Sequence, residues 1–380
     1  MRIPFNRPGL HGREIEYIQD AVKRGKLSGD GHYTTLANEL MKQYTGAEAC
    51  LLTHSCTAAL EMAAILLDLD KGDEVILPSF TFVSTANAIV LRDATPVFVD
   101  ICPDTLNIDP IKIEEAITPN TKAIFVVHYA GVICDMEHID KIARKHDLVI
   151  IEDAAQALLS ERNGRKAGSF GAMAAFSFHE TKNIISGEGG ALTISDPKYI
   201  ERAEIIREKG TNRRQFFRGA VDKYTWVDIG SSYLPSELTA SFLYAQLEIA
   251  QELTHARLTA WNQYHQALES FEACKLITRP YSPPKGEKHN AHMYQILLPN
   301  TELRSSFIAR MKARNITTPF HYVPLHSAPA GIRFGKTSGD MSVTNDISSR
   351  LVRLPMFAGI KNEQNQVVDA VLETLHELSN

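Results

Sequence analysis

The chain has 380 residues, 44% of them hydrophobic and 22% charged, which is typical of a globular protein and argues against a disordered or fibrous one. Its net charge of −5 gives no general electrostatic reason to expect a nucleic-acid or membrane partner. The five cysteines form no CxxC pair, so neither a disulfide framework nor a cysteine-rich zinc site is indicated. Because the N-terminus has no apolar signal core and no run reaches the roughly 18 apolar residues of a membrane helix, we expect a cytoplasmic protein without a membrane partner.

Strands and helices are predicted to alternate along the first half of the chain. Strand-like apolar runs lie at 74–77, 96–99, 123–127, 148–151, 174–178 and 191–194, and helix-forming stretches lie at 57–69, 83–92 and 136–146. Continuous apolar strands separated by helices are typical of a parallel sheet that helices cover on both faces. The pattern therefore predicts an α/β architecture.

The pattern changes after about residue 240. A helical stretch over 236–270 contains few breakers and leads into the proline-rich segment 280–286, after which short strands such as 294–298 mix with helices. We therefore expect two units. Residues 1–240 would form an N-terminal segment and a large α/β domain, and residues 241–380 a long connecting helix and a small α+β domain.

Two charged side chains follow predicted strands, at the place where ligands bind in open parallel sheets. Asp153 ends the run LVIIED and would point into the crevice, although Asp at such a place also serves as a helix N-cap. Lys182 lies between two predicted strands and precedes the glycine-rich segment 187–190. A desolvated lysine there can bond covalently to a carbonyl compound, whereas a solvated loop lysine is the simpler alternative.

Two further features lie beside predicted strands and helices. The segment 53–57 (THSCT) brings hydroxyl groups and free backbone N–H groups to the positive end of a helix dipole, which suits a phosphate, although N-capping alone explains the same residues. Phe82 either stacks on a flat ring or packs in the core. Together with Lys182 and Asp153, these are the parts that a pyridoxal phosphate (PLP) site needs.

Three segments around these candidate residues have distinctive sequences. They are GDEVILPSFTFVST (72–85), EDAAQ (152–156) and FSFHETKN (176–183). Their sequences resemble those of the sugar aminotransferases of the DegT/DnrJ/EryC1/StrS family, and the similarity extends from about residue 27 to about residue 357. The resemblance implies the PLP-dependent transferase fold type I, with a large, mostly parallel-sheet α/β domain and a smaller C-terminal α+β domain. It also implies a homodimer with active sites at the subunit interface.

The resemblance assigns roles to residues at the matching positions. Lys182 would hold PLP and act in catalysis, Asp153 would bind the ring nitrogen and keep it protonated, and Gln156 would reach the ring hydroxyl. Phe82 and Ala155 would lie on the two faces of the ring. The phosphate would contact Ser55, Cys56, Thr57 and Ser177, with Ser232 of the second subunit where relatives place an Asn. Relatives with His in place of the lysine eliminate a hydroxyl instead, so Lys182 favours transamination.

The resemblance further implies L-glutamate as the amine donor and a nucleotide-linked 4-keto-6-deoxy sugar as the acceptor, with dTDP-4-keto-6-deoxy-D-glucose as the first candidate. Arginines between 207 and 218 would suit its diphosphate, or would form a solvated basic loop. The candidate substrate contacts are His179, Arg213, Arg214, Arg218, His321 and His326. With no carboxylate at ligand spacing from the last two, a metal is not expected.

Two alternatives stay open at this point. The first is an aminotransferase of the same family that acts on another ketosugar, at C3, or with an equatorial amine at C4. The second is a regulatory protein that keeps the fold and the cofactor without turnover. A dehydrogenase is disfavoured because no GxGxxG motif follows the early strands.

Overall fold

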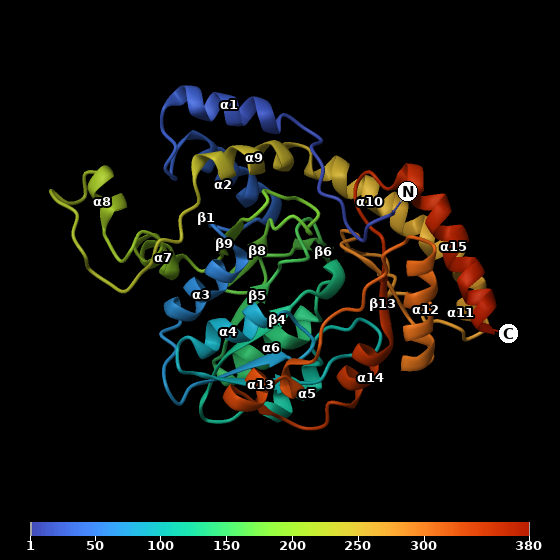
Figure 1. The fold of residues 1–380 in the computed structure, drawn as a ribbon. Coiled ribbons are helices and arrows are strands. Elements are labelled where there is room, and N and C mark those ends of the chain that lie inside the picture. The colour runs from blue at the N-terminus through green and yellow to red at the C-terminus, as the bar shows by residue number, and fades with distance from the viewer. Residues whose placement is uncertain (1, 380) are drawn as a thin grey trace.

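An eight-stranded sheet forms the centre of the molecule (Figure 1), in the computed structural model that describes residues 2–379. In spatial order its strands are β1 (Ala49–Thr53), β9 (Gly190–Ile194), β8 (Met173–Ser177), β5 (Val149–Asp153), β4 (Thr121–Val127), β2 (Glu74–Pro78), β3 (Thr95–Val99) and β12 (Lys336–Thr337). All neighbours from β8 to β12 pair in parallel, and β9 runs antiparallel to both β8 and β1. The mostly parallel sheet that the sequence predicts is confirmed.

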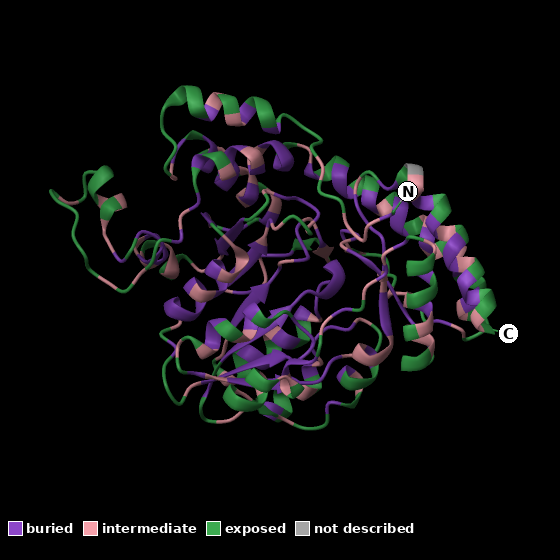
Figure 2. Cartoon of the chain, in the orientation of Figure 1, coloured by how far each residue is buried: buried purple, intermediate pink, exposed green. Residues whose placement is uncertain are grey.

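Helices cover both faces of this sheet. One face packs against α2 (His32–Thr45), α5 (Pro110–Ala116), α6 (Met136–His146) and α9 (Glu237–Glu248), and α1 (Glu14–Arg24) packs outside α9. The other packs against α3 (Cys56–Leu66), α4 (Val83–Val90) and α7 (Ile200–Arg207). Figure 2 shows the strands buried between helices whose outer faces are exposed. Because both faces are covered, a strand such as β2 is buried at every residue, which explains its unbroken apolar run.

A third hydrophobic core lies in the C-terminal part. It is built from α10 (Ala250–Ala267), α11 (Glu269–Ala273), α12 (Thr301–Ala313), α15 (Lys361–Ser379) and the two-stranded sheet of β11 (Tyr294–Leu297) and β13 (Leu351–Leu354). The predicted helix over 236–270 is two main helices, since Ile249 leaves the helical conformation between α9 and α10.

The domain boundary at residue 240 stays a proposal. It falls within α9, whose residues pack in the core of the large sheet. In addition, β12 comes from the C-terminal part of the sequence and pairs with β3 at the edge of the large sheet. The chain therefore crosses between the two parts more than once.

Shorter elements complete the structure. They are α8 (Arg213–Phe217), α13 (Pro329–Phe334), α14 (Ser342–Arg350), the small sheet of β10 (Glu287–Lys288), β6 (Glu161–Arg162) and β7 (Arg165–Lys166), and the 3-10 turns Tyr129–Gly131, Pro197–Tyr199 and Leu325–Ser327. The α8 segment projects from the body of the molecule at the left of Figure 1. None of the helices within residues 2–379 combines the length and the apolar character needed to span a bilayer.

Candidate active site

A cavity of about 780 Å³ brings Lys182 and Asp153 together. Its floor includes Val127, Asp153 and Ser177, which end the neighbouring strands β4, β5 and β8. Its opposite wall includes residues from the C-terminal part, such as Arg353 of β13. A ligand site beyond the carboxyl ends of parallel strands is what the topology predicts.

Asp153 is a buried carboxylate with no cation in direct contact. Its side chain accepts a hydrogen bond from the Thr85 hydroxyl at 2.7 Å and another from the Ala155 backbone N–H at 3.1 Å. Burial raises the pKa of Asp153, and these two hydrogen bonds, with the more distant charges of Lys182 and His128, oppose the shift only in part. Within residues 2–379 it makes no ion pair, so a buried cation supplied by a ligand would complete its environment.

Lys182 lies on the loop between β8 and β9, where its backbone N–H donates to the carbonyl oxygen of His179 at 2.9 Å. Burial lowers the pKa of its ammonium group. Across the described part of the chain that group makes no ion pair, and the charge of Asp153 opposes the shift only in part. A larger fraction of neutral amine at neutral pH is what a lysine needs to act as a nucleophile or a base.

The N-terminus of α3 forms one side of the cavity. Ser55 caps this helix, since its side chain accepts from the Ala58 backbone N–H at 3.1 Å, and Cys56 and Thr57 also line the cavity. The first turn of α3 carries no acidic residue, so the positive end of the helix dipole is not neutralised. These donors suit a phosphate.

Gly190 makes the close packing beside this N-terminus possible. A Cβ atom at residue 190 would lie 2.3 Å from the carbonyl carbon of Ser55 and 2.4 Å from the backbone nitrogen of Cys56. Any other side chain would therefore push β9 away from the first turn of α3. Ser177 faces Gly190 across the β8–β9 pair and lines the same cavity.

Phe82 and Ala155 both line the space beside Asp153. Phe82 precedes the first residue of α4 and is 56% exposed, which is unusual for a phenylalanine and leaves its ring face free for a flat ligand. Its ring centroid lies 6.3 Å from that of Tyr322. Gln156 accepts from the Ala130 backbone N–H at 2.7 Å and donates to the Tyr322 hydroxyl at 2.8 Å, so its orientation is fixed by two contacts.

The other predicted substrate contacts are divided between the cavity and the surface. His179 and His321 line the cavity, and His321 shares a hydrogen bond of 2.7 Å with the Tyr129 hydroxyl. His326 does not line it and hydrogen-bonds the Ser79 hydroxyl at 2.7 Å. Ser232 lies away from the cavity of its own chain, in a β-bridge with Glu208.

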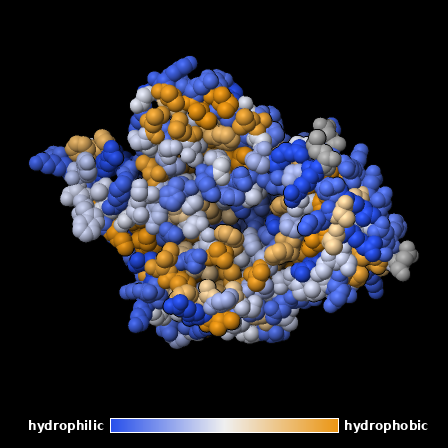
Figure 3. Space-filling view, in the orientation of Figure 1, coloured by the Kyte–Doolittle hydropathy of each residue, from blue (hydrophilic) through white to orange (hydrophobic). Residues whose placement is uncertain are grey.

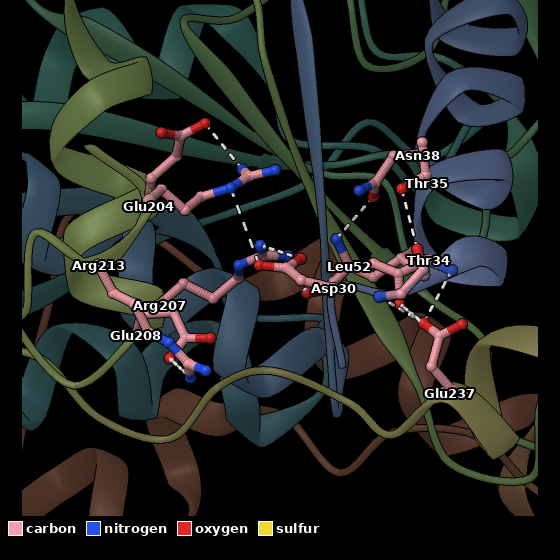
Figure 4. A network of polar contacts seen from close by, with 12 residues as sticks. Asp30, Thr34, Thr35, Asn38, Leu52, Glu204, Arg207, Glu208, Arg213 and Glu237 are labelled. Carbon is pink, nitrogen blue, oxygen red and sulfur yellow. Dashed lines mark hydrogen bonds and ion pairs between the residues drawn. The ribbon is translucent and has the colours of Figure 1, made fainter. Parts of the chain in front are cut away.

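The three arginines predicted for the diphosphate face acidic side chains. Arg214 and Arg218 each lie 2.7 Å from Glu204, and Arg213 lies 3.8 Å from Glu208. Figure 4 shows these glutamates beside the buried Arg207, which bonds Asp30 at 2.6 Å. None of the three lines the cavity of its own chain, so their contact with a diphosphate stays a prediction.

Several residues in the cavity wall or directly behind it were not singled out from the sequence. Thr85 is fully buried behind Asp153, in the segment 72–85, and its hydroxyl position four residues after Thr81 in TFVST was the available signal. Tyr322 follows His321 in the loop that was examined for substrate contacts. Arg353 interrupts the apolar run LVRLP, which was the available signal for a functional cation in β13.

These features fit PLP. An unpaired buried carboxylate, a lysine whose pKa is lowered, an uncompensated helix N-terminus and an exposed aromatic face surround one cavity. They match the ring nitrogen, the aldehyde, the phosphate and the ring of that cofactor. No group of three or more His, Cys, Asp or Glu side chains that could hold a metal ion occurs within the described residues.

The fold is that of known aminotransferases. The aminotransferase TlmJ from Streptoalloteichus hindustanus matches with a TM-score of 0.91 and 28% identity, covering 100% of both chains. Spr1654 from Streptococcus pneumoniae, solved in a pyridoxamine phosphate (PMP) form, matches with a TM-score of 0.91 and 25% identity over 99% of this chain and 98% of that one. Fold and site together define a PLP-dependent transaminase of fold type I.

The sequence comparisons identify the family. The model of the DegT/DnrJ/EryC1/StrS aminotransferase family matches residues 8–372, and the chain belongs to this family. It is 32% identical to the spore coat polysaccharide biosynthesis protein SpsC of Bacillus subtilis, over 99% of this chain and 97% of that protein. It is 31% identical to GDP-perosamine synthase of Caulobacter vibrioides, over 98% of each. The expected sugar aminotransferase family and its cofactor are confirmed.

Proposed function

We propose that this protein transfers the amino group of L-glutamate to C4 of a nucleotide-linked 4-keto-6-deoxy sugar. The observation that carries the proposal is the meeting of the half-buried Lys182 and the buried Asp153 in one cavity, neither of them in an ion pair within the described residues. The acceptor is dTDP-4-keto-6-deoxy-D-glucose and the product dTDP-4-amino-4,6-dideoxy-D-galactose, for surface polysaccharide synthesis. The segment resemblance supports this choice, and the name of SpsC supports a role in polysaccharide synthesis.

The cofactor residues act by position and charge. When bound, PLP supplies an aldehyde carbon that carries the amine between two substrates and a ring that takes up electrons from the broken bond. Asp153 holds the proton on the ring nitrogen, because a positive partner relieves its burial. The N-terminus of α3, with Ser55, Cys56 and Thr57, binds the phosphate. Ser177 adds a hydroxyl beside it.

The remaining cavity residues orient the ring and move the proton. Phe82 covers one ring face and Ala155 the other, while the Nε2 donor of Gln156 reaches the ring hydroxyl. Lys182 holds the cofactor between turnovers. Once displaced, its Nζ would take the proton from the α-carbon of glutamate and pass it to the former aldehyde carbon of the cofactor. In the second half-reaction it would take a proton from that carbon and deliver it to C4 of the sugar. The lowered pKa of Lys182 keeps its amine able to accept that first proton near neutral pH.

A second candidate acceptor is a GDP-linked ketosugar. The specific observation that favours it is the 31% identity to GDP-perosamine synthase over 98% of each chain. Both acceptors would place the ketosugar beside Lys182. Only the part of the site that binds the nucleotide base would distinguish one from the other. Amination at C3, or an equatorial amine, is a further outcome of the same experiment.

The acceptor is tested on enzyme that already carries the amine. The purified protein is saturated with PLP, treated with excess L-glutamate and freed of small molecules by gel filtration. It is then mixed separately with dTDP-4-keto-6-deoxy-D-glucose, its GDP-linked counterpart and a 3-keto analogue, and the products are identified by mass spectrometry and NMR. We expect stoichiometric amination of the dTDP sugar at C4 with an axial amine. A faster reaction of the GDP sugar would replace the acceptor, and amination of none would favour the regulatory alternative.

We also propose that the active form is a homodimer. Apolar side chains are exposed along α1, where Figure 3 shows a hydrophobic patch at the top of the molecule, including Ile15 and Val22. Phe217 at the end of α8 is exposed, and Trp226 on the segment after it is 79% exposed. A second copy of the chain would cover these groups and bring Ser232 to its neighbour's phosphate site. Light scattering should give twice the chain mass, and a monomeric active holoenzyme would contradict this.

A further inference from the structure

β1 leads directly into the turn that is proposed to bind the PLP phosphate. It is an edge strand of the large sheet, paired only with β9 among the strands of residues 2–379, and it ends at Thr53, two residues before Ser55. The N–H and C=O groups on the outer side of an edge strand have no partner strand. The groups that satisfy them therefore help to fix the position of the turn.

Three hydrogen bonds cover the outer side of β1 and the residue after it. The Leu52 N–H donates to the Asn38 side-chain oxygen at 3.0 Å, and the Leu52 carbonyl oxygen accepts from Nη1 of Arg207 at 3.2 Å (Figure 4). The His54 N–H donates to the Tyr233 carbonyl oxygen at 2.9 Å. Leu52 and His54 are thus both held from outside the sheet, immediately before the phosphate-binding turn.

Arg207 takes part in two of these three connections. Its side chain holds Leu52 directly, and its own carbonyl oxygen accepts from the Tyr233 N–H at 3.2 Å. The second contact keeps the Tyr233 carbonyl beside His54. Arg207 ends α7 and Tyr233 follows the segment 208–232, which carries α8 and projects from the molecule (Figure 1). The two ends of that segment therefore meet at the end of β1.

The burial of Arg207 is not explained by stability alone. Its side chain is 0% exposed, Nη2 lies 2.6 Å from the Asp30 carboxylate, and Nε has no hydrogen-bond partner among the described residues. A buried ion pair is often no more stabilising than well-packed apolar side chains, and an unpaired buried donor adds a further cost. An apolar side chain, however, would leave the Leu52 carbonyl without its donor. The contact with Leu52 is therefore what an arginine supplies at this place.

We propose that Arg207 is a positioning residue for the cofactor phosphate, which rests on the proposed binding of that phosphate at the N-terminus of α3. Arg207 does not line the cavity, so it acts through β1 and not by touching the ligand. The turn transmits its position, because the Thr53 hydroxyl donates to the Ser55 carbonyl oxygen at 2.8 Å and Ser55 caps α3. A shift of β1 therefore moves the N–H donors of the first turn of α3.

The test compares two ligands that differ only by the phosphate. The cofactor is removed from the purified full-length protein, and the apo-protein is titrated with PLP and with pyridoxal, with the visible band as the signal. Inorganic phosphate is titrated separately by calorimetry. A general loss of structure would weaken PLP and pyridoxal alike, whereas a displaced phosphate site weakens only PLP and inorganic phosphate.

The variants are Arg207→Met, Arg207→Lys and Asp30→Asn, with Arg279→Met as the matched control. Arg279 also has a mostly buried side chain, 14% exposed, that bonds one carboxylate and one carbonyl group, and it lies outside the cavity lining. Its substitution removes the same kinds of contact far along the chain from β1. Asp30→Asn changes a partly exposed side chain and leaves Arg207 itself in place.

We expect Arg207→Met to raise the Kd for PLP by about 10- to 100-fold, as for the loss of one or two charge-assisted hydrogen bonds to the phosphate. The Kd for inorganic phosphate should rise with it, and the Kd for pyridoxal should stay at the wild-type value. Arg207→Lys should recover part of the loss, because a lysine keeps the charge without the planar fork. Asp30→Asn should show a smaller rise of the same kind, and Arg279→Met none.

Two results would overturn the role of Arg207. These are equal weakening of PLP and pyridoxal, and a Kd for PLP that neither Arg207→Met nor Arg207→Lys changes. If Arg207→Met does not fold, Arg207→Lys and Asp30→Asn decide by the same comparison. A wild type that binds pyridoxal as tightly as PLP would refute the phosphate site, and the role of Arg207 with it. If L-glutamate fails to bleach the wild-type holoenzyme, the proposed amine transfer fails, while the comparison of PLP with pyridoxal still judges Arg207.

Discussion

Asp153→Asn separates the stability of the apo-protein from its affinity for PLP. The carboxylate is 5% exposed and unpaired within the described chain, and burial raises its pKa. The folded apo-protein therefore binds this proton more tightly than the unfolded chain does. It follows that the stability contributed by the protonated group is present at low pH and is lost as the pH rises through the folded-state pKa. The substitution removes that loss, because an amide does not titrate.

The size of the effect follows from the local contacts. The amide oxygen can still accept from the Ala155 N–H, and its NH₂ group can donate to the Thr85 hydroxyl, which lies 2.7 Å from the present oxygen. Replacing a buried charge by a neutral group of the same shape stabilises by about 1–2 kcal/mol, at the lower end of measured cases. With an unfolding entropy of about 2.1 cal/mol/K per residue over 380 residues, the apo variant should melt about 1–3 °C above the wild type at pH 8.

Adding PLP should make the wild type, and not Asp153→Asn, the more stable of the two proteins. The wild type gains a charge-assisted hydrogen bond to the ring nitrogen worth about 1.5–3 kcal/mol, which the variant lacks. The same energy makes the variant bind PLP about 10- to 150-fold more weakly, and because a ligand stabilises by RT ln(1 + [L]/Kd), PLP should raise its melting temperature by less.

The assay is calorimetric melting at pH 5, 6, 7 and 8, with and without PLP. Asp340→Asn, which changes an exposed aspartate, serves as the control and should leave both series unchanged. The reasoning would be refuted by an apo wild type at least as stable as Asp153→Asn at pH 8. Equal stabilisation of both proteins by PLP would refute it as well.

Three further substitutions test other parts of the site. Lys182→Ala should leave the fold intact but abolish bleaching by L-glutamate, and amine transfer by this variant without an added amine would disprove its role. Thr85→Val removes the hydroxyl that donates to the Asp153 carboxylate, so it should raise the pKa of Asp153 further. The acid limb of the pH–rate profile of the glutamate half-reaction should then move to higher pH, and an unchanged profile would count against the contact. Gly190→Ala places a Cβ 2.3 Å from the Ser55 carbonyl carbon. It should lower the free energy of unfolding of the protein by about 1–3 kcal/mol and weaken PLP binding. The control Gly359→Ala, with open space around its Cβ, should change neither quantity.

The sequence predicted the parts of the fold that local pattern determines. The runs at 74–77 and 123–127 coincide with β2 and β4 because both strands are buried on two faces and bounded by turns. The direction of β9 could not be predicted in this way, since it depends on which strands it pairs with, and these are β8 and the distant β1. The break of the helix at Ile249 carries no proline or glycine signal, so the long stretch was predicted as continuous.

The same distinction between local sequence pattern and tertiary contacts applies to the residues of the candidate site. Lys182 and Asp153 were found because each follows an apolar strand, and parallel strands bring their carboxyl ends to one edge. The acidic partners of Arg214 and Arg218 depend on how α7 lies beside α8, which sequence spacing alone does not give. Arg353 reaches the cavity from a different sheet, so its position required the tertiary fold.

The central claim is that Lys182 holds PLP and that the cofactor accepts the amine of L-glutamate. The most direct measurement is the visible absorption spectrum of the purified protein, reconstituted with PLP, before and after addition of L-glutamate. We expect a yellow protein whose band glutamate bleaches, with the colour restored by the ketosugar. A protein that stays colourless after incubation with PLP would contradict the cofactor site, and a yellow protein that glutamate leaves unchanged would contradict the donor.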